Sequence, residues 1–295
     1  MKIVYIGTVE FSYHCLVEVL KNNGEVTGII TSKNNKFNSD YQDPTPIAKK
    51  HNIPIYYCKN INSSATLEWI KNKKPDILFC FGWSQLLKKE ILSIAPMGCL
   101  GVHPALIPKN RGRHPIIWSL ALGLKESGLT FFFIDEGADS GPILSQRTFN
   151  ISNQDNARTI IEKIKKLASF QISEFLPQLI SGSYKTVPQN PEKATYWRKR
   201  SPKDGLIDWR MHSDSILNLI RALTKPYPGA QFIYEEAHIT VWAAHEFKEK
   251  TPENIEPGKI IQIENRKPVI KCYNSAIVID EHEPRTVFTE GEYIK

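Results

Sequence analysis

The stretch that decides the fold class lies at the start of the sequence and reads KIVYIGTVEF over residues 2–11. Its apolar run from Ile3 to Ile6 is typical of a buried strand, the turn Gly7-Thr8 ends that strand, and helical periodicity begins at Phe11. The same order of strand and helix recurs along the chain, which predicts βαβ units and a largely parallel sheet buried on both faces. We expect strands at 3–6, 26–31, 53–57, 77–81 and 99–102, and helices at 11–21, 45–50, 66–72 and 86–94.

The second half of the sequence predicts a different architecture. A long amphipathic helix begins after Ser152-Asn153, and the polar, proline-containing segment 184–202 is typical of a linker. One more helix is expected at 213–224, followed by short runs of strand-forming residues at 231–234, 238–243, 259–263, 269–272 and 276–279. We therefore predict a doubly wound α/β domain over 1–183, a linker over 184–202 and a small antiparallel, barrel-like domain over 203–295.

Composition places the chain among globular proteins and leaves its partner open. Hydrophobic residues make up 41% of the chain and charged residues 23%, and the formal net charge of +7 permits a nucleotide, a folate tail, RNA or an acidic surface as partner. The five cysteines are scattered, and no His/Cys group has metal-ligand spacing, so we expect no metal. Since no apolar run reaches about 18 residues, we expect a cytoplasmic protein that does not associate with membranes.

Two polar segments carry the candidate chemistry. His103 lies just past the end of a predicted strand and precedes a loop with Arg111-Gly112, and Asp139 lies in a glycine-rich acidic loop. Open α/β sheets bind ligands at the carboxyl ends of their strands. A histidine can take a proton from an amine near neutral pH, and a nearby carboxylate can orient it. A single histidine at a strand end, or a single aspartate in a turn, is more often structural, so it is their joint occurrence with the Arg-Gly loop that indicates a site.

These segments resemble the formyltransferases that use N10-formyltetrahydrofolate, a family that includes methionyl-tRNA formyltransferase and the sugar N-formyltransferases. The family pattern is Asn-x-His, a Leu-Leu-Pro loop with Arg-Gly, and an Asp before a Gly. The matching residues here are Gly101-Val102-His103, Leu106-Ile107-Pro108, Arg111-Gly112 and Asp139-Ser140-Gly141. The opening turn 7–11, the folate-contacting loop 81–87 and the start of the C-terminal domain at 221–230 also resemble the family. The resemblance covers nearly the whole chain.

The resemblance implies a catalytic pair in which His103 assists proton removal from the acceptor amine and Asp139 supports His103. The sequence departs from the family at Gly101, where an asparagine would donate a hydrogen bond to the developing oxyanion; losing such a donor costs about 3 kcal/mol in other enzymes. Three alternatives are open: Asn110 replaces the amide, a water replaces it, or catalysis is weak or altered. A second departure is Phe132, which stands where many relatives have histidine and predicts a more apolar pocket.

The same resemblance implies binding residues and a formyl donor, N10-formyltetrahydrofolate. The residues expected to hold the donor are Gln85, Leu86, Leu87, Ile134 and Asp135. Trp83 is expected to line the cleft or to belong to the core. Arg111 and Arg113 are expected either to meet an anionic group of the substrate or to form a structural Arg-Gly turn.

Two acceptors fit the resemblance. The tRNA-directed relatives have a long basic loop after the second strand, whereas the loop here, residues 32–43, is shorter and contains two acids but no Gly or Arg. This weakens the case for a phosphate-binding loop, and the segment 194–205 also resembles sugar enzymes. We therefore expect a nucleotide-linked amino sugar, of the 4-amino-4,6-dideoxy class used in surface polysaccharides such as lipopolysaccharide, and no nucleic acid. Methionyl-tRNA and a non-catalytic relative are the alternatives, and the resemblance also implies a homodimer.

Overall fold

The structure, a computed structural model, describes residues 1–33 and 40–294. Its contacts form two compact units. The first comprises Met1–Pro115, Glu126–Asn150 and Ile161–Trp197, and the second comprises Ile116–Lys125, Ile151–Ile160 and Arg198–Lys295.

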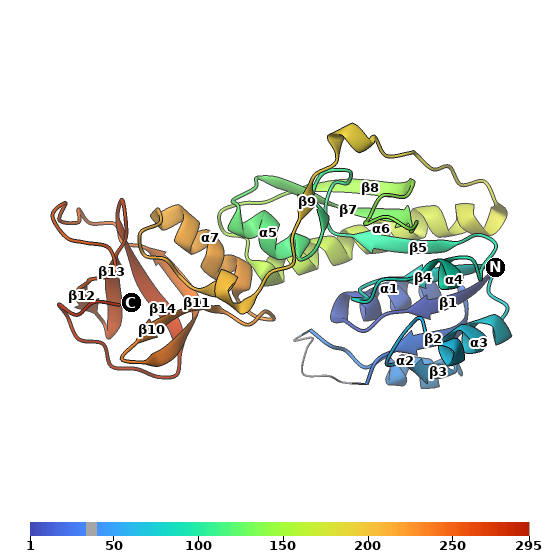
Figure 1. Cartoon of the computed structure of the whole chain (residues 1–295), viewed down its shortest axis with the longest axis horizontal. Coiled ribbons are helices and arrows are strands. Elements are labelled where there is room, and N and C mark those ends of the chain that lie inside the picture. The colour runs from blue at the N-terminus through green and yellow to red at the C-terminus, as the bar shows by residue number, and fades with distance from the viewer. Residues whose placement is uncertain (34–39, 295) are drawn as a thin grey trace. The chain divides into compact units, whose positions relative to one another are not determined.

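A seven-stranded sheet forms the centre of the first unit (Figure 1). Its strands are β1 Lys2–Ile6, β2 Glu25–Thr31, β3 Ile55–Tyr57, β4 Ile77–Cys80, β5 Cys99–His103, β7 Glu126–Phe133 and β8 Ile143–Asn150. The order across the sheet is β3-β2-β1-β4-β5-β7-β8. The first five strands pair in parallel as the sequence predicts, whereas β7 is antiparallel to β5 and to β8. The prediction of a doubly wound, mostly parallel sheet is confirmed.

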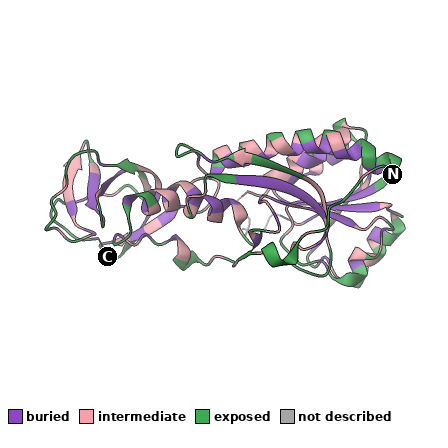
Figure 2. Cartoon of the chain, turned by 90° about the horizontal axis from the view of Figure 1, so that it is seen from above, coloured by how far each residue is buried: buried purple, intermediate pink, exposed green. Residues whose placement is uncertain are grey.

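Helices cover the strands, which are largely buried (Figure 2). The helices are α1 Glu10–Lys21, α2 Thr45–Lys50, α3 Ser64–Asn72, α4 Lys89–Leu92 and α6 Ala157–Ser181. Helix α6 packs on the antiparallel part of the sheet, where the rings of Phe175 and Phe131 lie 4.9 Å apart and the buried Gln171 donates from Nε2 to Ser145 Oγ at 2.9 Å. The helix predicted over 86–94 is shorter than expected because Leu86 lies in the preceding loop, where its carbonyl accepts from Asn62 Nδ2 at 2.8 Å.

The strand order places the candidate site. Sequence order reverses between the neighbouring strands β1 and β4, and β5 pairs with β4 on the far side of that reversal. Ligands bind open α/β sheets at such a reversal, beyond the carboxyl ends of the strands. His103 is the last residue of β5, so it lies at this edge of the sheet.

The second unit contains a five-stranded antiparallel sheet. Its elements are α5 Pro115–Ala121, which begins at the last residue of the first unit's opening segment, α7 Ser213–Leu223, β10 Ala230–Tyr234, β11 Ala237–Glu246, β12 Ile260–Glu264, β13 Lys267–Lys271 and β14 Ala276–Glu283. The order is β10-β11-β14-β13-β12, and each neighbouring pair is antiparallel. Inward residues such as Phe232, Val241 and Ile277 are fully buried, which explains the alternating apolar pattern. The predicted antiparallel C-terminal sheet is confirmed.

The segment predicted to be a linker belongs to the first unit as far as Trp197. Val187 and Ile143 exchange two backbone hydrogen bonds of 2.8 Å. The short strand β9, Tyr196–Trp197, pairs in parallel with β6, Arg111–Gly112. This segment is therefore a fixed part of the structure around the predicted site up to residue 197.

All five cysteines are buried and free. Among the described residues, no group of three or more His, Cys, Asp or Glu side chains could hold a metal ion. None of the helices within 1–33 and 40–294 has both the length and the apolar character needed to cross a bilayer.

Candidate active site

His103 is held at the end of β5 with both ring nitrogens facing oxygen atoms. The residue is 4% exposed. Its Nε2 lies 2.8 Å from the carbonyl oxygen of Asn110, and its Nδ1 lies 3.5 Å from Asp139 Oδ2. Because each ring nitrogen faces an oxygen atom, both N–H groups of the protonated ring have an acceptor. The arrangement suits a side chain that gains a proton during a reaction.

Asp139 reaches this position from a strained turn. Its φ is 52°, a left-handed value that is uncommon for a residue with a side chain. Besides facing His103, its Oδ2 accepts a hydrogen bond of 2.8 Å from the backbone N–H of Gly112. The structure therefore brings together the two residues that the sequence predicts as a pair, and it adds a backbone donor that orients the carboxylate.

The loop between β4 and α4 holds three of the predicted donor-binding residues. The side chain of Gln85 turns away from any ligand: its Oε1 accepts from the backbone N–H of Ile61 and its Nε2 donates to the carbonyl of Lys59, both at 2.9 Å. Leu87 is buried in the core of the first unit, whereas Leu86 is 70% exposed. Gln85 and Leu87 therefore fix the loop, and Leu86 is the apolar side chain left to contact a ligand.

The backbone of this loop has hydrogen-bond donors without partners among residues 1–33 and 40–294. Within the described residues, the backbone N–H groups of Gln85, Leu86 and Leu87 make no hydrogen bond, so they are available as donors. Trp83 packs against the core, as the structural reading of the sequence expects, and its buried Nε1–H has no partner in the part of the chain that the structure describes.

The other two predicted donor-binding residues differ in what they do. Ile134 packs against the same core cluster as Trp83 and Leu87. Asp135 organises its own loop, since its Oδ1 accepts from Gly137 N–H at 3.0 Å and from Ser140 Oγ at 2.6 Å. Ile134 thus lies beside the predicted donor loop, and Asp135 shapes the turn that leads to Asp139.

The side chain of Ile134 also explains the missing asparagine. A Cβ atom added at Gly101 would lie 2.7 Å from Ile134 Cγ1 and 3.3 Å from Phe132 Cε1. Apolar atoms therefore fill the space that an asparagine side chain would need. Asn110 directs its backbone carbonyl at His103, while its side-chain Oδ1 accepts from Thr195 Oγ1 at 3.4 Å. The oxygen of the Asn110 side-chain amide is thus bonded to the segment 184–197.

Arg111 and Arg113 have different environments although they are two residues apart. Arg111 is 3% exposed, and it donates to Gln189 Oε1 from Nε at 3.1 Å and from Nη2 at 2.6 Å, and to Tyr196 Oη from Nη1 at 2.9 Å. Arg113 is exposed and donates one bond of 2.9 Å to the carbonyl of Ser84. Arg111 therefore has the structural role that the sequence offers as an alternative to anion binding. Arg113 remains available to an anionic ligand.

Sequence reasoning did not find the residues of segment 184–197 that hold this site. Gln189 contacts both Arg111 and the Asp139 turn, and Thr195 contacts Asn110. Their neighbourhood is polar and proline-containing, which is the same signal that predicts a linker. The parallel pairing of β6 with β9 and the backbone bonds between Val187 and Ile143 bring these residues to the site.

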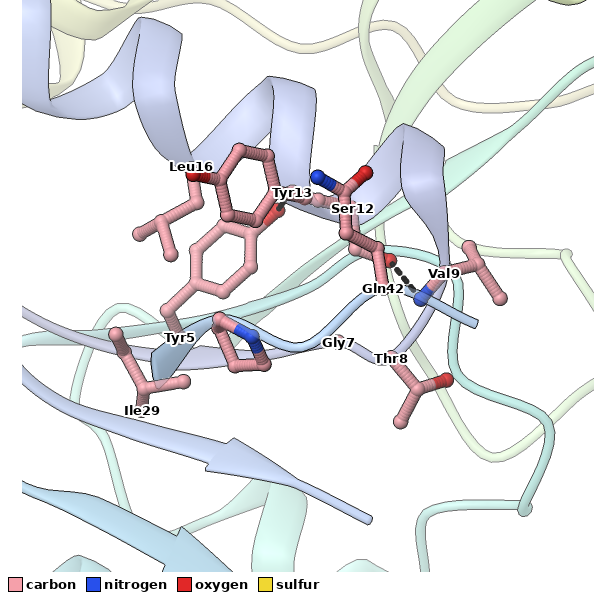
Figure 3. Close-up of a pocket in the computed structure, with 10 residues that line it drawn as sticks. Tyr5, Gly7, Thr8, Val9, Ser12, Tyr13, Leu16, Ile29 and Gln42 are labelled. Carbon is pink, nitrogen blue, oxygen red and sulfur yellow. Dashed lines mark hydrogen bonds between the residues drawn. The ribbon is translucent and has the colours of Figure 1, made fainter. Parts of the chain in front are cut away.

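A small pocket opens elsewhere in the first unit, at the turn between β1 and α1 (Figure 3). Figure 3 shows Tyr5, Tyr13 and Gln42 around it, and Val9 N–H donates to Ser12 Oγ at its edge at 3.3 Å. None of its lining residues belongs to the predicted site, so the pocket and the His103–Asp139 pair are separate features.

Comparisons with known proteins identify the family of the chain. The family model described as "Formyl transferase" matches residues 1–176, and the one described as "Formyl transferase, C-terminal domain" matches residues 199–287. A methionyl-tRNA formyltransferase of Kosmotoga olearia is 33% identical over 285 residues, which is 95% of this chain and 91% of the relative. That of Bacillus velezensis is 31% identical over 288 residues, covering 96% of this chain and 90% of the relative.

A solved structure shows the same fold. The N-formyltransferase of Helicobacter canadensis, in complex with folinic acid and dTDP-3-aminofucose, superposes with a TM-score of 0.72 at 20% identity, covering 95% of this chain and 98% of the other. The resemblance inferred from the sequence motifs is confirmed. Because the two family models together match most of the sequence, this chain belongs to the folate-dependent formyltransferase family and is a formyltransferase.

Proposed function

We propose that this formyltransferase transfers the formyl group of N10-formyltetrahydrofolate to the amine of a nucleotide-linked amino sugar, of the 4-amino-4,6-dideoxy class used in surface polysaccharides. The observation that carries the proposal is the pairing of His103 Nδ1 with Asp139 Oδ2 at 3.5 Å. Amine attack on a formyl carbon releases a proton, and the pair offers a base with a carboxylate behind it.

Each residue of the pair has a role that follows from its contacts. His103 assists removal of the proton from the acceptor amine, and Asp139 Oδ2, 3.5 Å from Nδ1, stabilises the ring when it carries a proton. The carbonyl of Asn110, 2.8 Å from Nε2, fixes the ring so that Nδ1 keeps facing the carboxylate. Burial of His103 excludes water from the proton being moved.

The loop 82–87, with Ile134 beside it, is the proposed donor site. The unpaired backbone N–H groups of Gln85, Leu86 and Leu87 would donate to acceptor atoms along the edge of a pterin. Leu86, 70% exposed, would cover its apolar face. When bound, the folate supplies the formyl group, and the chain supplies its placement next to His103.

Two observations favour an amino sugar as the acceptor. The loop 32–43 lacks the glycine and arginine of a phosphate-clamping loop; residues 34–39 of it lie outside the described part of the chain. The solved N-formyltransferase of Helicobacter canadensis, whose fold this chain shares over 95% of its length, was crystallised with dTDP-3-aminofucose. The exposed Arg113 offers a guanidinium to the phosphates of such a substrate.

Methionyl-tRNA is the second candidate acceptor. The relatives from Kosmotoga olearia and Bacillus velezensis, both more than 30% identical, carry the name methionyl-tRNA formyltransferase. The net charge of +7 is compatible with an RNA partner. Binding a tRNA neutralises several phosphates, so KM for tRNA would rise steeply with salt, whereas a nucleotide sugar with two phosphates would show a shallow dependence.

The test is a direct comparison of acceptors. The purified chain is incubated with N10-formyltetrahydrofolate and, separately, with dTDP-4-amino-4,6-dideoxyglucose, dTDP-3-aminofucose and initiator methionyl-tRNA, and the products are identified by mass spectrometry. Formylation of a nucleotide sugar with little formylation of the tRNA is the expected result. Formylation of the tRNA alone would reject the sugar, and His103→Gln serves in each reaction as the control for background transfer.

A further inference from the structure

The side chain of Gln189 lies directly behind the turn that carries Asp139. Its Nε2 donates to the carbonyl of Asp139 at 2.9 Å and to the carbonyl of Gly141 at 2.6 Å. The two bonds tie the beginning and the end of this turn to one amide group. Because Asp139 has a left-handed φ of 52°, its backbone conformation costs free energy and persists only where surrounding contacts hold it.

The other end of the Gln189 amide is fixed just as firmly. Its Oε1 accepts from Arg111 Nε at 3.1 Å and from Nη2 at 2.6 Å. Arg111 is 3% exposed and is held in addition by Tyr196 Oη. Charge-assisted bonds from a planar, buried guanidinium leave the amide one orientation, with its nitrogen toward the two carbonyls.

These contacts form a closed hydrogen-bond network around the carboxylate of Asp139. Arg111 holds Gln189, Gln189 holds the backbone of Asp139, and Asp139 Oδ2 accepts from the N–H of Gly112, the residue next to Arg111. The same Oδ2 faces His103 Nδ1 at 3.5 Å. If Gln189 no longer donates to this network, the turn keeps the strained φ of Asp139 but loses the two hydrogen bonds that stabilise it.

We propose that Gln189 is a positioning residue of this enzyme, which sets the distance from Asp139 to His103 through the donors of its amide. The inference rests on the proposed catalytic role of Asp139. It gives the segment 184–197 a part in the reaction although Gln189 itself contacts neither His103 nor the Asp139 carboxylate in the hydrogen bonds of the described residues.

The substitution Gln189→Glu keeps an accepting oxygen at the end of the side chain and removes its N–H donors. The glutamate keeps an oxygen for Arg111 and pairs with it more strongly, so the segment stays attached. Its second oxygen cannot donate, and it faces the carbonyls of Asp139 and Gly141 with like partial charge. The matched control is Gln231→Glu on β10, which makes the same chemical change in the second unit, where Gln231 Nε2 bonds Thr240 Oγ1 at 3.5 Å.

Three measurements are made on wild type, Gln189→Glu and Gln231→Glu. The first two are kcat and KM, with whichever acceptor of the panel above the wild type turns over. The third is hydrogen exchange at the Gly112 amide, which reports its bond to Asp139 without any acceptor. We expect Gln189→Glu to lower kcat roughly 10- to 100-fold with KM little changed, and to speed exchange at Gly112, since small misplacements of a catalytic group have effects of this size. Gln231→Glu should match the wild type in all three.

Two outcomes would overturn the inference. Unchanged kcat in folded Gln189→Glu would show that the amide donors do not position Asp139, and so would a loss of activity with Gly112 exchange unchanged. Asp139→Asn is measured in parallel to keep the two proposals apart. If Asp139→Asn is inactive while Gln189→Glu is normal, only the positioning role fails; if Asp139→Asn is itself fully active, the catalytic role of Asp139 fails and the positioning role fails with it.

Discussion

The donor loop 82–87 and the turn that carries Asp139 lie in the same unit, but they are held in different ways. The donor loop has one buried side chain, Leu87. The side chain of Gln85 bonds backbone atoms of residues 59 and 61, and the side chain of Asn62 bonds the carbonyl of Leu86. The Asp139 turn has little apolar anchoring and is fixed by hydrogen bonds from Gln189 and Gly112. The donor loop therefore combines packing with hydrogen bonds, whereas the Asp139 turn depends on hydrogen bonds.

The difference determines what a substitution does in each region. Apolar packing is non-directional, so loss of the buried Leu87 side chain from the donor loop should appear first as lost stability. Hydrogen bonds fix angles as well as distances, so damage around the catalytic pair should appear as lost turnover in a protein that still folds. The four predictions below are ordered from the largest expected effect to the smallest.

Replacing the base gives the largest effect. His103→Gln keeps a donor for the Asn110 carbonyl but cannot take a proton near neutral pH, so kcat should fall about 10²- to 10⁴-fold while the thermal midpoint changes little. The second unit supplies a matched control, His245, whose Nδ1 lies 2.7 Å from Asp280 Oδ2. If His103→Gln retains wild-type kcat, or if His245→Gln loses as much activity, the pair at His103 is not the base.

The adjacent leucines of the donor loop test the role of packing. Leu87 is 6% exposed, so Leu87→Ala should lower the free energy of unfolding by about 2–5 kcal/mol. Leu86 is 70% exposed, so Leu86→Ala should change stability by no more than about 0.5 kcal/mol and instead raise KM for N10-formyltetrahydrofolate. Urea unfolding and donor titration measure the two effects. Equal stabilities of the two variants would contradict this account of the loop.

Gly101 lies where the two regions meet. Gly101→Asn would place Cβ 2.7 Å from Ile134 Cγ1, and overpacking of this kind costs about 1–3 kcal/mol. Adding Ile134→Ala should remove most of that cost, and the double variant should then have a higher kcat than Ile134→Ala alone if the new amide serves the oxyanion. A Gly101→Asn variant as stable as wild type would show that Ile134 does not block the position.

Arg113 gives the smallest effect. The side chain of Arg113 donates one exposed hydrogen bond of 2.9 Å to the carbonyl of Ser84 in the donor loop. Because only this bond is lost, Arg113→Ala should lower the free energy of unfolding by only about 0.5–1.5 kcal/mol. We expect a higher KM for the nucleotide sugar as well, because the guanidinium is free to meet phosphate. Arg210→Ala, which removes an exposed arginine paired with Asp208 in the second unit, is the control. The same KM in both variants would remove Arg113 from substrate binding.

Much of the fold could be predicted because its signals are local. Strands such as 77–81 are continuous apolar runs and helices such as 11–21 show a regular period, so each element is visible in its own sequence. The antiparallel strand β8 was not predicted, since its exposed residues, among them Gln146 and Arg147, hide the pattern. The helix expected over 86–94 spans only 89–92 in the structure. Its expected first residue, Leu86, lies in a loop because its carbonyl accepts a hydrogen bond from the distant Asn62.

The site was predictable only in part. His103 and Asp139 stand in motifs, and the structure places them 3.5 Å apart as the motifs imply. The residues that hold this pair in place do not belong to any sequence motif. Gln189 lies 50 residues from Asp139 along the chain, in a segment whose composition indicates only a linker. The distinction between Arg111 and Arg113 is equally invisible, because both are arginines in one short loop.

By itself the sequence determined the alternation of strands and helices, the family, and the histidine–aspartate pair, because short-range periodicity and motif residues fix these. The tertiary structure decided which arginine is buried, which leucine of the donor loop enters the core, and which distant amide holds Asp139. The physical reason is that burial and hydrogen bonding depend on which segments the folded chain brings together. The parallel pairing of β6 with β9 joins residues 85 positions apart, and no local pattern records it.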